Sequence, residues 1–449
     1  MNNIIPKDKS EDYIFERKKN EDINNQFIKE KRNIPKKDIE SKDKDDRNNK
    51  LNNLKINDFS LSFIGQNSKK IFRALKEQNQ QNFSIFPNED DESVDVSNNE
   101  ENEFNYLSNI KPKGLKNLGS CCYMNATLQC FYHIKELTNY FLKNKKEIKK
   151  KDGLLSNGLL DVIEGLSNNN SYTYYIPQTF KDNLLEVDDV FEGFEGKDSG
   201  DLVQTILLTI QDELGGEIEL PDFSIDQRDE SAMFIDLYVK NNLSKSIITD
   251  LFNFYIRIQN RCCHCGNCFY SLSSENYLMF DLKQVYSINE LNKVNNNRNN
   301  TYRSVSIDNC LACYSFDGAN NENAECKICK KNGYIFSVRS FITLPKYLIM
   351  VMSRGEAEKF ECHVEIKEEI DLNDSFKEIK GMPKERNTKY NLIAGTILHG
   401  SGGYGHTVAF CKHFDEKFYI FNDSSCFLTN LDYIKKQKIY LLFYKKKID

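Results

Sequence analysis

The segment Gly114-Leu-Lys-Asn-Leu-Gly-Ser-Cys-Cys-Tyr-Met-Asn125 stands directly before the first long helical pattern of the chain. Apolar side chains recur with helical spacing across residues 122–142, so the segment predicts the entry to a helix. Its two glycines suit a tight entry turn. A thiol at a helix N-terminus meets the positive end of the helix dipole, which stabilises its thiolate. The segment therefore indicates a nucleophilic cysteine at Cys121 or Cys122, with a buried, inert cysteine as the alternative.

A second informative segment, 390–410, contains two of the six histidines. Its pattern predicts a strand, a glycine-rich hairpin and a second strand that begins at His406. The four glycines between His399 and His406 permit a mobile loop and a close approach of the backbone. A cysteine nucleophile needs a base, and the base needs an orienting group. These two histidines have a context that the other four lack.

The segment Phe418-Tyr-Ile-Phe-Asn-Asp-Ser-Ser-Cys426 predicts a strand that ends in a turn. Asn422 and Asp423 occupy that turn, and turn chemistry alone would account for both residue types. A last apolar run, residues 439–444, predicts the closing strand. Further β-rich runs lie between residues 334 and 421, after the helical patterns at 122–142 and 202–214. Helices first and antiparallel strands later predict an α+β fold.

The chain contains 14 cysteines, none before Cys121, and eight of them fall between Cys262 and Cys329. Clustering of this kind favours a metal site over a disulfide scaffold. Three pairs have the C-x-x-C spacing: Cys262/Cys265, Cys310/Cys313 and Cys326/Cys329. Two such pairs form a four-thiolate zinc site. Polar turns flank the first and third pairs, whereas the second pair lies in a predicted capped helix start. We therefore expect structural zinc on Cys262, Cys265, Cys326 and Cys329, although Cys263 or Cys268 would serve as substitutes.

Composition narrows the class of protein further. The net charge of −6 argues against a dedicated nucleic-acid binder. The longest apolar runs are far shorter than the roughly 20 residues of a membrane-spanning helix, and we see no secretory signal. We expect a cytoplasmic or nuclear protein without membrane or nucleic-acid partners, most simply a monomer. Residues 1–110 are rich in asparagine and charged residues, and we predict a disordered arm before a folded domain at 111–446.

The first segment resembles the cysteine box of the ubiquitin-specific protease family, G-L-x-N-x-G-N-T-C-Y-M-N. The resemblance implies that Cys122 is the nucleophile and that the amide of Asn117 belongs to the oxyanion hole. Cys121 and Ser120 stand where the family usually has Thr and Asn. The histidine segment is similar to the family's histidine box, which implies that His406 is the general base. Its loop is one residue shorter than the common form, and Thr407 replaces the usual Tyr.

The same resemblance assigns roles to other residues. The family's W-x-x-F-[DN]-D segment implies that Asn422 orients His406, with Asp423 beside it. The family also carries zinc on the same outer cysteine pairs, in a fingers subdomain. Residues 191–202 resemble a degenerate acidic box, and Asp198 and Asp201 match the positions that hold the ubiquitin tail. In this box Gly196 and Lys197 replace two glutamines.

The resemblance extends over roughly residues 112–446 and implies a papain-like fold with thumb, palm and fingers. The implied activity is thiol-dependent hydrolysis of the bond after the C-terminal glycine of ubiquitin, which removes ubiquitin from conjugated proteins or chains. Ubiquitin and ubiquitinated proteins would then be the partners. Two alternatives stay open: a protease for another ubiquitin-like modifier, or an inactive ubiquitin-binding scaffold.

Overall fold

The structure, a computed structural model, describes residues 106–169, 171–193, 196–215, 233–234, 237, 245–292, 303–326, 328–355, 360–377, 387–400 and 405–448. Residues 1–105, which make up most of the predicted arm, lie outside this part of the chain. Residues 401–404 of the glycine-rich loop do so as well. Within the described ranges, no helix has the length and apolar character needed to cross a membrane.

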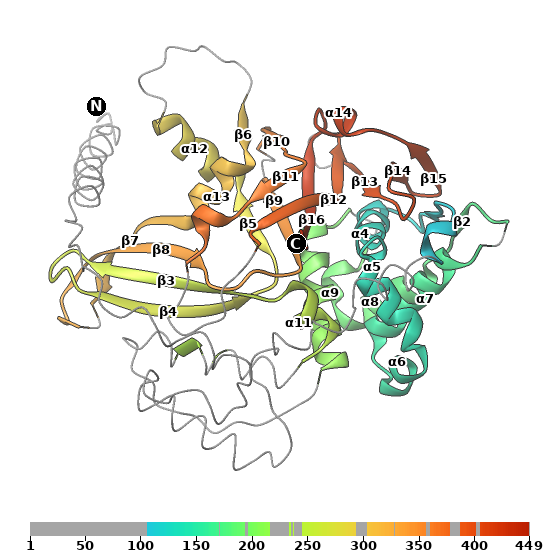
Figure 1. Ribbon diagram of the computed structural model, residues 1–449, viewed down its shortest axis with the longest axis horizontal. Coiled ribbons are helices and arrows are strands. Elements are labelled where there is room, and N and C mark those ends of the chain that lie inside the picture. The colour runs from blue at the N-terminus through green and yellow to red at the C-terminus, as the bar shows by residue number, and fades with distance from the viewer. Residues whose placement is uncertain are drawn as a thin grey trace, which may run out of the picture. The chain divides into compact units, whose positions relative to one another are not determined.

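Helices dominate the first half of the folded region (Figure 1). The α-helices are α4 Cys122–Tyr132, α5 Lys135–Lys143, α6 Lys145–Lys151, α7 Leu154–Ser167, α8 Gln178–Val187, α9 Ser199–Leu214, α11 Ile247–Phe252, α12 Leu282–Asn292, α13 Ile307–Ser315 and α14 Leu431–Ile434. Short 3-10 helices are η3 Leu107–Asn109, η4 Asp189–Phe191 and η5 Asn373–Ser375.

Strands dominate the second half and form one large sheet and three smaller ones. The strands are β1 Gly114–Leu115, β2 Tyr174–Tyr175, β3 Phe254–Cys262, β4 Cys268–Glu275, β5 Leu278–Asp281, β6 Ser304–Ser306, β7 Phe316–Glu325, β8 Asn332–Phe341, β9 Tyr347–Ser353, β10 His363–Glu365, β11 Glu369–Asp371, β12 Lys389–His399, β13 His406–Lys412, β14 Phe418–Asn422, β15 Ser425–Leu428 and β16 Ile439–Lys446. The predicted α+β fold is confirmed.

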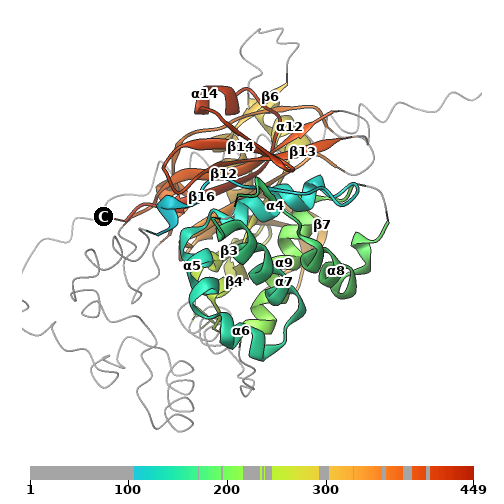
Figure 2. The ribbon, with the colours of Figure 1, turned by 90° about the vertical axis from the view of Figure 1, so that its right-hand side faces the viewer.

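The large sheet, which we call the palm sheet, has eight strands in the order β15-β14-β13-β12-β16-β9-β5, with β11 paired to β12. Both of its faces are buried, as β9 illustrates. Tyr347, Ile349 and Val351 pack with helices α4 to α9, while Leu348 and Met350 pack with α12 and α13 on the other face. Figures 1 and 2 show α4 lying directly against β12 and β13. A strand that is buried on both faces needs a continuous apolar run, and β9 and β16, two inner strands of the palm sheet, have one.

The helical pattern of residues 122–142 forms two helices instead of one. Helix α4 ends at Tyr132, and the next residue, His133, caps it: its ring Nδ1 lies 2.7 Å from the carbonyl oxygen of Gln129. Ile134 then adopts an extended conformation, and the Thr138 hydroxyl bonds the carbonyl oxygen of Tyr132 at 2.6 Å. Side chains therefore satisfy the carbonyl groups that the helix end leaves free. The helical spacing of apolar residues continues across the break between α4 and α5, so the sequence pattern does not reveal where the first helix ends.

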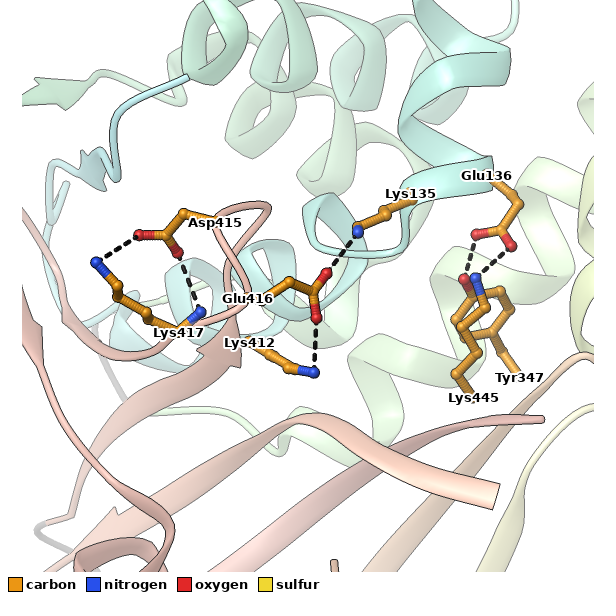
Figure 3. A network of polar contacts seen from close by, with 8 residues as sticks. All are labelled: Lys135, Glu136, Tyr347, Lys412, Asp415, Glu416, Lys417 and Lys445. Carbon is orange, nitrogen blue, oxygen red and sulfur yellow. Dashed lines mark hydrogen bonds and ion pairs between the residues drawn. The ribbon is translucent and has the colours of Figure 1, made fainter. Parts of the chain in front are cut away.

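Helix α5 is fastened to the palm sheet by a half-buried ionic contact. The Glu136 carboxylate accepts hydrogen bonds from the Lys445 ammonium group at 2.7 Å and from the Tyr347 hydroxyl (Figure 3). Burial disfavours the charged form of Glu136, but Lys445 outweighs it and the pKa of the carboxyl group lies below its usual value. The contact thus joins α5 to both β16 and β9.

A separate four-stranded sheet, in the order β4-β3-β8-β7, forms the fingers sheet. Its core is confined to the end nearest the palm sheet, where Phe254, Ile256 and Phe341 pack with palm residues. Farther along, most side chains of β3, β4 and β8 are only half-buried. The far end contains the turn between β3 and β4 and the turn between β7 and β8. The cysteine pairs lie in these turns.

Candidate functional site

Cys122 is the first residue of α4, and its side chain is almost fully buried, with 8% exposure. The backbone N–H of Thr407 donates a hydrogen bond to its Sγ atom at 3.5 Å. Because Thr407 follows His406 at the start of β13, packing of α4 on β13 brings the two sequence segments together. The residues are 285 positions apart in the chain. The predicted helix entry at the cysteine is confirmed.

His406 and Asn422 lie on neighbouring antiparallel strands, β13 and β14. The His406 Nε2 atom is 2.7 Å from the Asn422 Oδ1 atom. A carbonyl oxygen only accepts, so Nε2 must carry the hydrogen in this contact. The neutral ring then has its lone pair on Nδ1. Asn422 therefore fixes both the tautomer and the orientation of the ring.

His399 lies opposite His406 across the β12–β13 pair. Partial burial lowers the pKa of His399, and the neighbouring His406 lowers it further. His399 therefore favours the neutral form beside the histidine that we expect to act as a base.

The side chain of Asn117 is held at both ends. Its Oδ1 atom accepts hydrogen bonds from the backbone N–H groups of Gly119 at 3.0 Å and Cys121 at 3.3 Å. Its Nδ2 atom donates to the Asp423 carboxylate at 3.0 Å. These contacts determine which way the amide points, and they leave one of the two Nδ2 hydrogens for another acceptor.

Cys121 contributes to the same arrangement and differs from its neighbour. Its Sγ atom accepts a hydrogen bond from the Leu118 N–H at 3.0 Å and donates to Asn117 Oδ1 at 3.3 Å. Burial raises the pKa of the Cys121 thiol, which favours the neutral S–H form. The thiol therefore behaves as a hydrogen-bonding group in the loop that holds Asn117.

Asp423 accepts contacts from three residues of the cysteine segment. Its backbone oxygen bonds the Leu115 N–H at 2.8 Å, and its carboxylate bonds Asn117 and also Asn125 Nδ2, the latter at 2.8 Å. Its φ of 47° lies in the left-handed region, which Asp tolerates better than most residues. A Cβ atom on Gly114 would lie 2.4 Å from the Asp423 oxygen, so only glycine fits at that position.

Sequence reasoning did not single out Asn125. The available signal was the place of Asn125 at the end of the cysteine segment, three residues after Cys122. Its partner is 298 positions away, so the contact was not evident from spacing.

Asp198 and Asp201 lie at the start of α9. Asp198 is the N-cap residue and accepts a hydrogen bond from the Gly200 N–H at 2.6 Å. The Tyr440 hydroxyl of β16 donates to the same carboxylate. Asp201 is exposed in the first helical turn, where the helix dipole favours a negative charge. Asp198 thus caps α9 and binds Tyr440, a partner that sequence reasoning missed, and the expected contacts of Asp198 and Asp201 with the ubiquitin tail stay a prediction.

The four predicted metal ligands do lie together. The sulfur atoms of Cys262, Cys265, Cys326 and Cys329 all lie within 4.8 Å of one another. Two of the sulfur–sulfur distances, Cys262–Cys329 and Cys265–Cys326, are 3.8 Å. By contrast, Cys310 is fully buried in α13, whose start Ser306 caps as predicted. The cluster can hold a metal ion with all four positions of a tetrahedron filled.

A sequence model of the family described as ubiquitin carboxyl-terminal hydrolase matches residues 113–444. The ubiquitin carboxyl-terminal hydrolase Usp2 of Drosophila melanogaster is 23% identical over 347 residues, covering 74% of this chain and 34% of that protein. Ubiquitin carboxyl-terminal hydrolase 3 of Homo sapiens is 24% identical over 358 residues, covering 74% of this chain and 67% of that protein. The chain therefore spans about a third of the fly relative and about two thirds of the human one.

Solved structures share the fold. A SAGA DUB module of Ubp8, Sgf11, Sus1 and Sgf73 bound to monoubiquitin gives a TM-score of 0.56 at 17% identity, covering 76% of this chain and 70% of that chain. The module of the same four proteins bound to ubiquitin aldehyde gives a TM-score of 0.55 at 18% identity. The family model matches well over half of the chain, within the folded region that contains the cysteine, histidine and four-cysteine segments. The chain belongs to the ubiquitin carboxyl-terminal hydrolase family.

Proposed function

We propose that this chain is a thiol protease that hydrolyses the isopeptide or peptide bond after the C-terminal glycine of ubiquitin. The observation that carries the proposal is the meeting of three segments at one point. Cys122 at a helix N-terminus lies against the start of β13, His406 at that start is oriented by Asn422, and Asn117 offers a fixed amide. A nucleophile, a base with its orienting group and an oxyanion donor are the parts that acyl transfer requires.

His406 is the base in this mechanism. Since its Nε2 hydrogen is committed to Asn422, Nδ1 is the atom that accepts the proton of the Cys122 thiol. The sulfur then attacks the carbonyl carbon of the terminal glycine. The resulting imidazolium donates its Nδ1 proton to the leaving lysine amine, which leaves a thioester. Water, deprotonated by His406, hydrolyses the thioester and releases ubiquitin.

The oxyanion formed in each step needs donors that are already in place. The free Nδ2 hydrogen of Asn117 is one donor. The backbone N–H of Cys122 is another, because the first turn of a helix leaves its N–H groups without intrahelical partners. One such donor contributes about 3 kcal/mol to transition-state stabilisation. Asp423 supports Asn117 by accepting its other Nδ2 hydrogen.

We also infer that the four-cysteine cluster binds a structural zinc ion. Zinc–sulfur bonds of about 2.3 Å in a tetrahedron place the sulfur atoms about 3.8 Å apart, and two measured pairs have this separation. Four thiolates leave no open position for catalysis. Zinc would therefore fasten the two turns at the far end of the fingers sheet, and catalysis would not pass through it.

The proposal is tested with ubiquitin that carries an electrophile at its C-terminus. We expect a covalent adduct on Cys122, no adduct in Cys122→Ala, and an adduct in Cys121→Thr. An adduct on Cys121 in the unaltered protein would overturn the assignment of the nucleophile. A panel of probes built on other ubiquitin-like modifiers tests specificity. Reaction with one of these and not with ubiquitin would make the chain a protease for that modifier, and reaction with none would make it a scaffold.

A further inference from the structure

Asn125 is a buried polar residue on α4, with 2% of its side chain exposed. Its Nδ2 atom donates to Asp423 Oδ1 at 2.8 Å and to the carbonyl oxygen of Leu115 at 3.3 Å. Its Oδ1 atom is buried and has no hydrogen-bond partner among the residues that the structure describes. An unpaired buried acceptor destabilises the folded state by about 1–3 kcal/mol. The Oδ1 atom of Asn125 therefore destabilises the folded state, whereas the Nδ2 atom forms two hydrogen bonds.

The surroundings of Asn125 explain this conflict. Both groups that face its Nδ2 atom, a carboxylate and a carbonyl, only accept hydrogen bonds. The site thus requires two N–H donors on a short, uncharged side chain, and asparagine is the residue that supplies them. A side-chain amide that supplies the NH2 group also brings its carbonyl oxygen, Oδ1, into the buried site.

Asp423 transmits this contact to the proposed oxyanion donor. One carboxylate oxygen bonds Asn125, and the other bonds the Nδ2 atom of Asn117. The Asp423 carboxylate therefore lies between the amides of Asn125 and Asn117. The contact with Asn125 restrains the carboxylate, and the carboxylate in turn restrains Asn117. Asp423 also directly follows Asn422, the partner of His406, so a shift of its backbone would reach the histidine as well.

We propose that Asn125 is a positioning residue for catalysis. Through the Asp423 carboxylate it holds the Asn117 amide in place to stabilise the oxyanion, and it restrains the turn that carries Asn422. This proposal rests on the proposed function. It assigns to Asn125 an effect on the rate of turnover and not on the binding of ubiquitin, because Asn125 is buried and lies behind the groups that would touch substrate.

The test is a double-mutant cycle on turnover of a fluorogenic ubiquitin substrate, with Asn125→Ala, Asp423→Ala and the double variant. We expect Asn125→Ala to lower kcat about tenfold, the equivalent of one hydrogen bond to a charged group, with KM within about twofold. In the Asp423→Ala background the same change should lower kcat by less than about twofold, because the contact is already gone. Thr127→Ala is the matched control. Thr127 is also buried on α4, and among the described residues its hydroxyl bonds only the helix backbone, at the carbonyl oxygen of Tyr123, at 2.8 Å.

Asn125→Asp provides a second measurement that loss of folding would not imitate. It keeps the size of the side chain but places two carboxyl groups at hydrogen-bond distance, where one of them holds a proton. The protonated pair restores one donor to Asp423, and deprotonation removes it. We therefore expect kcat of this variant to fall as the pH rises across a range in which the unaltered protein holds its activity.

Three outcomes decide the matter. If Asn125→Ala lowers the melting temperature as Thr127→Ala does and leaves kcat unchanged, the residue is a packing residue only and the proposal is overturned. If the losses of the two single variants add in the double variant, Asn125 does not act through Asp423, which also overturns it. If the unaltered protein turns over no ubiquitin substrate, the proposed function is what has failed.

Discussion

The candidate catalytic cluster and the four-cysteine end of the fingers sheet are held by different forces. The cluster lies where α4 packs against the palm sheet, above a core that is buried on both faces of that sheet. Its side chains are then tied by hydrogen bonds that join residues about 300 positions apart, such as Asn117 and Asp423. Packing sets the position of the elements there, and hydrogen bonds set the final geometry.

The far end of the fingers sheet has no comparable core in the described residues. Strands β3, β4 and β8 are half-buried along most of their length, and the feature that joins the two turns is a set of four sulfur atoms. Burial of apolar area contributes about 25 cal/mol per Å², so a thin sheet gains little from it. We therefore expect the candidate catalytic cluster to lose a functional side chain without unfolding, whereas the far end of the fingers sheet should unfold when one of its four cysteines is replaced.

The largest expected effect is on the fingers sheet, after loss of the proposed zinc ion. Cys326→Ser should reduce zinc from about one ion per chain to a small fraction. Structural zinc contributes on the order of 10 kcal/mol to folding of small zinc domains, so the tips of β3, β4 and β8 should lose their amide protection. Hydrogen exchange measures this, and α4 and the palm strands should remain protected.

Cys263→Ser is the matched control, since Cys263 is an exposed thiol in the turn between β3 and β4 that contributes Cys265 to the cluster, but it is not itself part of the cluster. It should retain zinc and protection. Depletion of zinc by Cys310→Ser, with zinc retained in Cys326→Ser, would show that the ligand assignment is wrong.

A smaller effect is expected in the catalytic cluster, and it should appear in the rate alone. Asn422→Ala should lower kcat about 100-fold, within the range for loss of a group that serves general acid–base catalysis. Asn422 is exposed at the end of β14, so the melting temperature should hardly change. Asn422→Asp should stay active, because a carboxylate also accepts the Nε2 hydrogen of His406.

Asp423→Ala tests whether the residue beside Asn422 also contributes to turnover. It should lower kcat less than Asn422→Ala does, but it should also destabilise the fold, since it leaves the buried Asn125 amide without its acceptor. Unaltered turnover in both variants would mean that this segment is only a turn and that His406 is oriented by another group.

Cys121 offers a finer test of how hydrogen bonds set the geometry of the cluster. A hydroxyl can accept from Leu118 N–H and donate to Asn117 Oδ1 as the thiol does, so Cys121→Thr should keep most of the activity. Cys121→Ala should lower kcat about fivefold, which corresponds to about 1 kcal/mol for one neutral hydrogen bond. Steady-state kinetics of the two variants would decide, and equal rates would remove Cys121 from the network that holds Asn117.

The smallest effect concerns acid stability of the palm side. His133 and His413 are buried with facing ring nitrogens 2.9 Å apart. Burial lowers the pKa of both rings below that of the unfolded chain. Their neutral forms therefore stabilise the fold above pH ~6.5, and this contribution is lost as the pH falls, by about 1.4 kcal/mol per pH unit for each extra proton that the unfolded chain binds.

Denaturant unfolding between pH 7 and 5 measures that slope. His413→Gln should reduce it, whereas His363→Gln, at a half-exposed position on β10, should leave it unchanged. An unaltered slope in His413→Gln would show that the buried pair does not govern acid stability. The charged groups of Figure 3 would then need to be tested, among them the half-buried Lys135 and Asp415 and the exposed Glu416.

Much of the cluster could be predicted because its residues fall in contiguous motifs. Cys122, His406 and Asn422 each have a local context of helix entry, strand start or strand end, and the fold brings those ends together. The clustering of the four cysteines was predictable for the same reason, since each C-x-x-C turn places two sulfur atoms on one side. Local spacing was sufficient wherever the chemistry was carried by a short segment.

The remaining features depend on tertiary contacts. Asn125 matters because of Asp423, Tyr440 because of Asp198, and His133 because of His413, and each pair is more than 200 positions apart. The break between α4 and α5 was missed because apolar residues keep their spacing across it. A single sequence does not show which distant residues form such contacts, since each residue taken alone suits its own helix or strand.

The course of α4 beside β13 has a mechanical consequence. The helix begins at Cys122 next to Thr407 and ends just before His133, which lies next to His413, so helix and strand touch at both ends. A helix of this length is about 16 Å long, so a tilt of about 2° about the histidine end would move Cys122 by roughly 0.5 Å. Catalytic groups tolerate displacements of about that size. A rotation of α4 about the contact between His133 and His413 would therefore change the distance between His406 and Cys122, the proposed nucleophile.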